Sequence, residues 1–408
     1  MADRAGVEAF DYPSDGVIEC PYPFYDALRS EAPVHRLPSG DVMISRWEDI
    51  VHVVRTPEIF SSLVGPSNEH VLGGPRVGGD DSGPWPLSFC DDPEHKSNRQ
   101  LNMFMVSRER LRMYEPVIRT LVDDLIDGFI GRGEAEFRTE FAERLPRRVS
   151  MEILGMPRED EPRFAEWFGG QGPRGTRLAS PEEQERETQN KRNLAEYMKT
   201  FIVERAERPA DDYLSALAAA QIERDGALDV PYLVTEAVGL FGAAVGTTMH
   251  FLSNSMLLLL QHPAELDALR DDPTRMRAFL EEALRAESPV QWSSRVAAVD
   301  TELHGVSIPA GSNILLVWGS GNRDPQRFEE PERFWVGRPA VAKHQLAFGY
   351  GMHMCIGAPL ARLEAQIAFE RLLARLRNLR LAEGATITYQ RRFNQRAPEA
   401  VPMRFDPA

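Results

Sequence analysis

One cysteine in this chain sits among closely spaced glycines, an arrangement that could hold a metal-bound flat ligand. The segment Phe348 to Gly357 reads Phe-Gly-Tyr-Gly-Met-His-Met-Cys-Ile-Gly, and its cysteine is Cys355. Glycines allow positive φ angles and let a backbone lie close to a ligand. A helix is predicted at 359–376, so Cys355 would face the unpaired N–H groups at its start, which should lower the thiol pKa and favour the iron-binding thiolate. A buried structural cysteine in a glycine-rich turn is the alternative.

Two further pairs of side chains are spaced to share one face of a helix. Glu282 and Arg285 are three residues apart in the predicted helix 274–286, and His95 and Arg99 are four apart. An exposed ion pair at the first position would contribute little. Two donors on one face, as at the second, suit a carboxylate, although a surface His/Arg pair is common.

The elements that must position these residues are mostly helical. Helical periodicity dominates from about 94 to 261, broken at 169–180, and short strands are predicted at 35–37, 42–45, 295–299 and 314–317. The segment 230–261 is apolar on every face, which favours a central buried helix over a membrane span. Residues 1–20 form an N-terminal tail, and 61–90 a long loop of the kind that is usually functional. We predict a mainly α single domain over 1–408 with a small β region.

The bulk properties exclude several classes of protein. A net charge of −15 argues against a nucleic-acid-binding protein. The cysteines at 20, 90 and 355 form no CxxC pair, so zinc and iron–sulfur sites are not expected. Their odd number suits a reducing cytoplasm, and the polar N-terminus lacks a signal pattern. We therefore expect a cytoplasmic protein that is not bound to a membrane. We also expect a monomer.

The glycine-rich segment resembles the haem-binding loop of the cytochrome P450 superfamily, Phe-Gly-x-Gly-x-His-x-Cys-x-Gly, at every specified position. The resemblance implies that Cys355 is the proximal ligand to the iron of haem b. It also implies that Phe348 packs under the haem and tunes the sulfur, and that His353 lies beside a propionate. Gly349 and Gly357 complete the cofactor loop.

The resemblance covers most of the chain, from about 21 to 405. It implies that Glu282 and Arg285 are an internal pair locked by Arg338, which stiffens the proximal side. It implies the triangular, mainly helical single-domain fold of the family. The remaining propionate-binding residues implied by it are His95, Arg99 and Arg295.

The predicted central helix departs from the family pattern at one position. The resemblance places Thr247 and Thr248 in the oxygen-binding groove, but Gly246 stands where the family has an acid that relays protons. Water, the substrate or His250 could replace that acid. Alternatively, Thr247 only bonds the carbonyl four residues earlier, or the reaction is a variant one, such as oxidative coupling, nitration or peroxide-driven oxidation.

The function implied is a monooxygenase that uses O2 and two electrons to hydroxylate, dealkylate or epoxidise a small or medium apolar or aromatic molecule. No flavin or iron–sulfur domain is fused, so a ferredoxin with its reductase, or a flavodoxin, would supply the electrons. A variant oxidative enzyme and a non-catalytic haem-binding sensor are the alternatives. A basic patch for the electron donor could comprise Arg108, Arg110, Arg112 and Arg362. The candidate substrate contacts are Trp85, Phe89, Phe168, Val238, Phe241, Ala243, Val290, Trp292 and Phe393.

Overall fold

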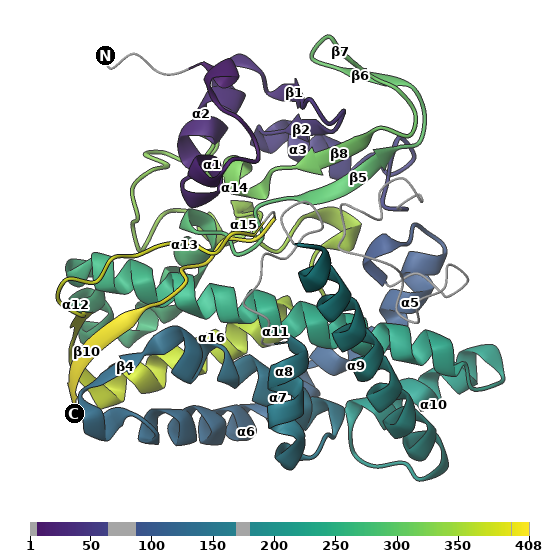
Figure 1. Ribbon diagram of the computed structural model, residues 1–408, viewed down its shortest axis with the longest axis vertical. Coiled ribbons are helices and arrows are strands. Elements are labelled where there is room, and N and C mark those ends of the chain that lie inside the picture. The colour runs from purple at the N-terminus through teal and green to yellow at the C-terminus, as the bar shows by residue number, and fades with distance from the viewer. Residues whose placement is uncertain (1–5, 64–86, 169–179, 393, 408) are drawn as a thin grey trace.

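The structure is a computed structural model of the chain, and it describes residues 6–63, 87–168, 180–392 and 394–407. Helices fill the larger part of the molecule, and a small sheet region lies at one end, beside the N-terminal helices (Figure 1). The predicted class, mainly α with a small β region, is confirmed.

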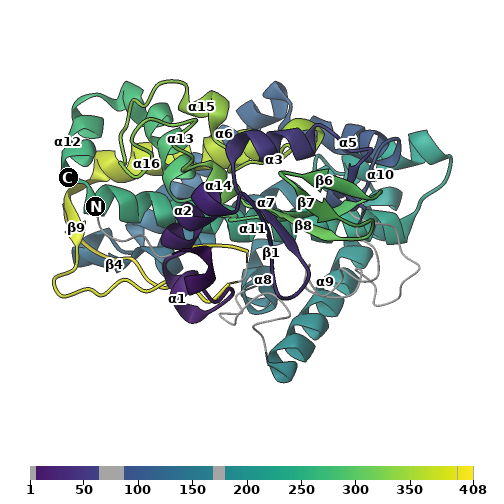
Figure 2. The same cartoon turned by 90° about the horizontal axis from the view of Figure 1, so that it is seen from above.

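Helix α11 (Val230–Gln261) runs through the middle of the fold, with the bounds that the sequence predicts. The side chain of Asp229 accepts a hydrogen bond from the Tyr232 N–H at its start. The helix is long and apolar enough to cross a membrane. However, it contacts α7 (Arg144–Leu154), α9 (Pro181–Glu207) and other helices on several sides (Figures 1 and 2), so we interpret it as a core helix.

The other helices surround α11 and bury their apolar faces in one cluster with it. The C-terminal helix α16 packs on α6, and α13 packs on both α11 and α16. The predicted helices 274–286 and 359–376 are confirmed, although the first begins with a 3-10 turn, η8 (Pro273–Arg275). The remaining larger helices are α5 (Glu94–Asn102), α6 (Arg108–Asp127), α8 (Glu161–Phe168), α10 (Tyr213–Asp225), α12 (Pro263–Asp271), α13 (Met276–Ala286) and α16 (Ala358–Arg375).

Within the described residues, the main sheet has five strands in the order β1-β2-β8-β5-β3. Strand β2 runs parallel to β8, and the other neighbours are antiparallel. All four predicted strands are present, and β5 starts two residues before the prediction because Ser293 and Ser294 pair with Leu316 and Leu315. The strands are β1 (Val34–Arg36), β2 (Val42–Ile44), β3 (Phe60–Ser61), β5 (Ser293–Ala297) and β8 (Asn313–Leu316).

Two smaller sheets were not predicted. Strand β10 (Pro402–Pro407) joins β4 (Glu134–Glu136) to β9 (Leu376–Leu381), and so connects segments that are far apart in the sequence. Strands β6 (Thr301–Leu303) and β7 (Val306–Ile308) form a hairpin. Each segment is short, and its pairing depends on distant residues that periodicity does not reveal.

The described part of the predicted N-terminal tail, residues 6–20, packs against the rest of the domain. Val7, in η1 (Val7–Ala9), and Val17, in α1 (Asp15–Glu19), are buried in a cluster with helix α2 (Tyr22–Glu31). Of the predicted loop 61–90, only its two ends lie within the described residues, and the second contains η3 (Leu87–Phe89). Among the described residues, the remaining short α-helices are α3 (Trp47–Val54), α14 (Trp318–Gly321) and α15 (Val341–His344).

Candidate active site

The cysteine loop joins α15 to α16 and takes the conformation that its glycines allow. Gly349 and Gly351 have φ angles of 71° and 73°, in the left-handed region that favours glycine. The Cys355 N–H donates to the Phe348 carbonyl over 2.8 Å and closes the loop. Gly357 is the N-cap of α16, and a Cβ there would lie 3.8 Å from the Cys355 sulfur. The loop therefore presents the sulfur at the start of the helix, as the sequence predicts.

The Cys355 sulfur is open on one side to a large internal cavity and enclosed by protein elsewhere. Burial raises the pKa of its thiol. The N–H groups of Gly357 and Ala358 and the charges of Arg99 and Arg362 oppose this rise only in part. The prediction of a lowered pKa is therefore wrong for the free thiol, because loss of solvation outweighs the helix start. A cationic metal at the open side would favour the thiolate.

Four basic side chains gather on the wall of the same cavity. The rings of His95 and His353 lie 4.0 Å apart, Arg99 donates to the Met354 carbonyl over 2.9 Å, and Arg295 is buried beside them. Burial, and then the charges of Arg295, His95 and Arg99, lower the pKa of His353 to about 3. Burial also lowers the pKa of Arg295 to about 10. These four predicted cofactor residues thus converge. Both pKa shifts come first from burial, and a bound anion would oppose them.

The residues present fit a haem. The Nε2 atom of His95 is buried and has no hydrogen-bond partner within the described chain. A pair of carboxylates would satisfy it and neutralise the basic cluster, and a haem carries two propionates. The cavity has a volume of about 480 Å³ and is lined mostly by apolar side chains between the cysteine loop and α11. A thiolate donor, an anion site and apolar walls are what an iron porphyrin requires.

The middle of α11 borders the cavity opposite the cysteine loop. The Thr247 hydroxyl donates to the Ala243 carbonyl over 2.6 Å, so its bond to its own helix is formed, as one alternative expected. Thr248 is buried and also lines the cavity. A Cβ added to Gly246 would meet nothing within 4 Å. His250 is fully buried and is not part of the cavity wall, so it is poorly placed to replace the missing acid.

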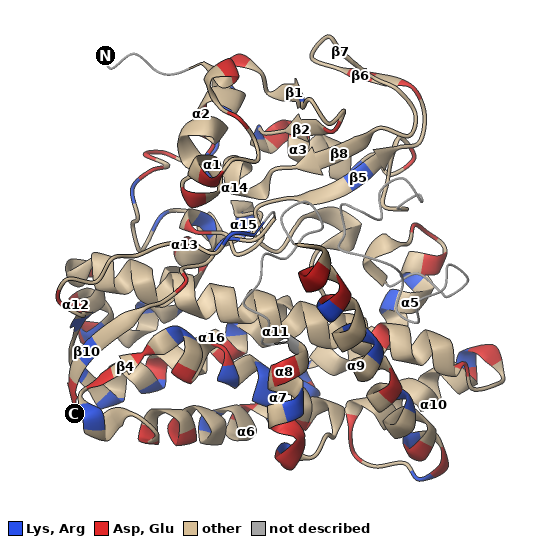
Figure 3. Cartoon of the chain, viewed as in Figure 1, with Lys and Arg blue, Asp and Glu red and all other residues tan. Residues whose placement is uncertain are grey.

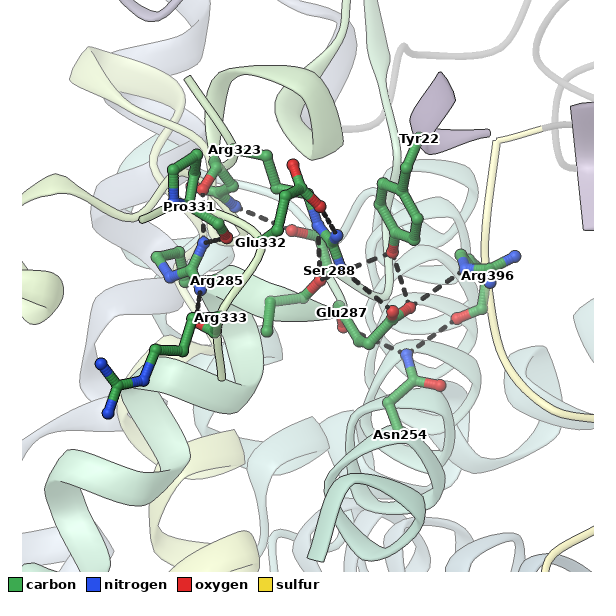
Figure 4. A network of polar contacts seen from close by, with 12 residues as sticks. Tyr22, Asn254, Arg285, Glu287, Ser288, Arg323, Pro331, Glu332, Arg333 and Arg396 are labelled. Carbon is green, nitrogen blue, oxygen red and sulfur yellow. Dashed lines mark hydrogen bonds and ion pairs between the residues drawn. The ribbon is translucent and has the colours of Figure 1, made fainter. Parts of the chain in front are cut away.

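The predicted three-residue ion cluster is present in the core. Arg285 donates two bonds of 2.8 Å to Glu282, and Arg338 adds bonds of 3.0 and 3.1 Å to the same carboxylate. Arg285 also donates to the carbonyls of Pro331 and Arg333 (Figure 4). None of the three charged side chains lines the cavity. Their hydrogen bonds tie α13 to the segment that leads to the cysteine loop.

Five of the predicted substrate contacts line the cavity, and one does not. Val238 is buried in the main core instead. It lies nine residues before Thr247, a rotation of about 180° around the helix, so its side chain points away from the cavity. Trp85 and Phe393 lie outside the described residues, as does the side chain of Phe168. The contacts that line the cavity are Phe89, Phe241, Ala243, Val290 and Trp292.

The sequence prediction missed two acids in the cavity wall. Glu364, in α16, is buried, and burial raises its pKa to about 8. Glu236, in α11, is also buried, and burial raises its pKa to about 7. Figure 3 shows how rare charge is along α11 compared with the surrounding helices. A single acid in an otherwise uncharged helix was the signal that could have found Glu236.

The predicted basic patch is only partly free for a partner. Arg110 bonds Asp211 over 2.8 Å, and Arg362 bonds Glu281 over 2.6 Å. The Arg362 guanidinium also lies 4.4 Å from the centre of the Phe348 ring. Arg362 therefore helps to hold the cysteine loop, and it borders a surface hollow next to Arg112.

Comparisons with known proteins agree with this geometry. Residues 177–389 match the family model of cytochrome P450. The biotin biosynthesis cytochrome P450 of Bacillus subtilis is 32% identical over 413 residues, covering 96% of this chain and 98% of that protein. The vitamin D(3) 25-hydroxylase of Pseudonocardia autotrophica is 32% identical, with coverage of 93% and 92%. A cytochrome P450 structure from Chondromyces apiculatus has a TM-score of 0.86, 32% identity and 97% coverage of both chains.

These likenesses span nearly the whole chain and include proteins named as monooxygenases, such as the steroid C26-monooxygenase of Mycobacterium tuberculosis, at 33% identity with 94% of this chain and 93% of that protein covered. Proteins of this family bind haem b through a cysteine thiolate and act on a substrate with O2 and redox partners. This chain belongs to the cytochrome P450 superfamily and is a haem-dependent monooxygenase.

Proposed function

We propose that Cys355 is the iron ligand and that the enzyme hydroxylates, dealkylates or epoxidises an elongated, mainly apolar molecule in the cytoplasm. The single observation that carries this proposal is the position of the Cys355 sulfur. It opens into an apolar cavity whose wall also holds four basic side chains suited to two propionates. Two of the similar proteins support the substrate class by their names, since one is a vitamin D(3) 25-hydroxylase and another a steroid C26-monooxygenase.

The bound haem would supply the iron chemistry that activates O2 with two electrons. The protein's own residues do the rest. His95, Arg99, Arg295 and His353, which line the cavity together, would hold the propionates by charge-assisted hydrogen bonds. Cys355 provides the thiolate, and the apolar walls exclude bulk water and orient the substrate.

Proton supply on the α11 side must differ from the common family arrangement. Gly246 has no side chain, and the Thr247 hydroxyl is already a donor to Ala243. The open space next to Gly246 supports delivery by water held there, or by the substrate itself. The same observation favours a second candidate function, a variant oxidation in which the ordinary proton relay is not needed.

For electrons, we propose a ferredoxin with its reductase. The surface hollow that Arg112 and Arg362 border lies beside α16, the helix that begins at the cysteine loop. A small acidic protein at this surface would be close to Cys355. Exchanging Arg112 for Gln should reduce the salt dependence of electron transfer, whereas the same change at the exposed Arg208, the C-cap residue of α9, should not.

The proposed function is tested by spectra and turnover. The wild-type protein loaded with haem should give the carbon monoxide difference spectrum of a thiolate-ligated haem, and Cys355→Ser should lose it. Cys20→Ser is the matched control, because Cys20 is exposed and does not line the cavity. Substrate-dependent consumption of reductant and O2, with an oxygenated product, would then separate the monooxygenase from the variant oxidation.

A further inference from the structure

Glu236 is an acid in the wall of the cavity, well before Thr247 along α11. It is the only Asp, Glu, Lys or Arg in the 32 residues of α11. It precedes Thr247 by eleven residues, which is a rotation of about 20° beyond three full turns and a rise of about 16 Å. Glu236 and Thr247 therefore lie on the same face of the helix, and both line the cavity.

Both carboxylate oxygens of Glu236 accept a hydrogen bond from a donor in the protein. Oε1 accepts from the Leu87 N–H over 3.2 Å, and Oε2 accepts from Asn102 Nδ2 over 3.0 Å. The same Asn102 nitrogen donates to the Asn98 carbonyl over 2.9 Å, and the hydroxyl of Tyr213 donates to Asn102 Oδ1. Because a carbonyl can only accept, these contacts fix the orientation of the Asn102 amide. Both Glu236 partners are thus donors, which suits the ionised carboxylate.

The carboxylate of Glu236 has no ion-pair partner in the described part of the chain. Arg224 is close enough to lower its pKa, but the Arg224 guanidinium bonds Asp225 and Asn98 and lies 5.0 Å from the centre of the Tyr232 ring. A carboxylate offers roughly four acceptor positions, of which two are occupied here. A buried charge with spare acceptors and no cation is costly unless a ligand completes it.

The cavity that Glu236 lines is mainly apolar. Its wall also includes Leu87, Phe89, Met105, Ile153 and Leu240. A ligand that extends along α11 in this cavity therefore meets mainly apolar walls and, about 16 Å along the helix axis from Thr247, the one acid of α11. This is the pattern of a site in which a few polar groups set the orientation of an apolar ligand.

We propose that Glu236 binds the ammonium group of an elongated, otherwise apolar amine substrate. This inference rests on the proposed function and names the substrate class. The distance along α11 sets the position of attack, so oxidation should occur on the order of 15 Å from the amino group. Shorter amines would be oxidised poorly because they cannot span from Glu236 to the iron.

A purely structural role is the competing explanation, since Glu236 ties η3 and α5 to α11 through Leu87 and Asn102. The two roles differ in what they predict for charge. A structural tie affects all ligands alike, whereas an ammonium site discriminates between two ligands of equal shape that differ only in charge.

The test compares such a pair of probes on the haem-loaded protein. One is a phenylalkyl trimethylammonium ion, whose nitrogen has no lone pair and cannot bind iron. The other carries a tert-butyl group in its place. Binding is followed by the shift of the Soret band. We expect the wild-type protein to bind the cation at least about tenfold more tightly, and Glu236→Gln to abolish that preference while changing the affinity for the neutral probe by less than about twofold.

The matched control is Glu223→Gln, the same change at an exposed residue of α10 that does not line the cavity. It should leave both affinities unchanged. The inference is overturned if the wild-type protein binds both probes equally, a result that does not depend on any variant folding. It is also overturned if Glu236→Gln weakens both probes equally while keeping its haem. Absence of a thiolate-type carbon monoxide spectrum in the wild-type protein would instead refute the proposed function.

Discussion

Replacing Glu236 by Gln should change how the stability of the protein depends on pH. Burial raises the pKa of this carboxyl from its ordinary 4.5 to about 7. A raised pKa means that the folded state disfavours the charged form. The resulting loss of folding stability is absent below pH 4.5 and complete above pH 7. At 1.36 kcal/mol per pKa unit, the full penalty is about 3 kcal/mol. Gln carries no such penalty. However, its NH2 group would face either the Leu87 N–H or the Asn102 amide, both donors, and this mismatch would cost about 1–3 kcal/mol at every pH.

The free energy of unfolding should therefore be measured for both proteins by urea titration from pH 5 to pH 8. The variant should be the less stable protein at pH 5. Between pH 5 and pH 8, its free energy of unfolding should rise by about 2.5 kcal/mol relative to that of the wild-type protein. The groups that face Glu236 do not titrate in this interval, since the pKa values of Tyr213, Tyr232 and Cys90 are raised and that of Arg224 is raised as well. A difference that stays constant across this range would refute the assignment of a buried carboxyl that ionises near pH 7.

Three other changes test the rest of the site. Cys355→Ser should abolish the thiolate-type carbon monoxide spectrum and reduce turnover to background, as absorbance and product formation would show. Gly246→Asp should fold normally, because the added side chain starts in open space. It should increase the product formed per O2 consumed if the reaction is an ordinary monooxygenation, whereas lost activity would indicate a variant reaction. Arg338→Met should lower the free energy of unfolding by about 3 kcal/mol by leaving the buried Glu282 with Arg285 as its one cationic partner among the described residues, and a loss below 1 kcal/mol would contradict that role. The same change at the exposed Arg333 should cost under about 1 kcal/mol.

The features that the sequence predicts well depend on local chemistry. The glycines of the cysteine loop are needed at positive φ angles. Helix α11 begins after the capping Asp229 and ends at Gln261, two residues before Pro263, where a new helix starts. Such signals act over a few residues, so a single sequence contains them. The Glu282, Arg285 and Arg338 cluster spans more of the chain and came from the family resemblance, because the spacing of the first two alone fits an exposed pair equally well.

The features that the sequence predicted poorly depend on how distant segments enclose a residue. The pKa of the Cys355 thiol is raised because loss of solvent outweighs the nearby helix start, and the balance cannot be judged without the enclosing atoms. The prediction that Val238 contacts the substrate is wrong for a local reason, since a separation of nine helical residues places it opposite Thr247. Strands β4, β9 and β10 pair across most of the chain, and no local pattern marks their partners.

The distance between Glu236 and Gly246 along α11 decides whether Glu236 can replace the acid that the family has at the position of Gly246. Family members place an acid directly before the threonine, and this chain has an acid ten residues earlier. Ten residues of helix separate the two positions by about 15 Å along the axis, which is several hydrogen bonds too far for direct proton transfer to the reacting end. The oxygens of Glu236 also accept hydrogen bonds from fixed donors rather than from a chain of hydroxyls leading toward Thr247. Glu236 is thus positioned to hold one end of a ligand, and we propose that protons for an ordinary monooxygenation at the other end come from water in the open space beside Gly246 or from the substrate itself.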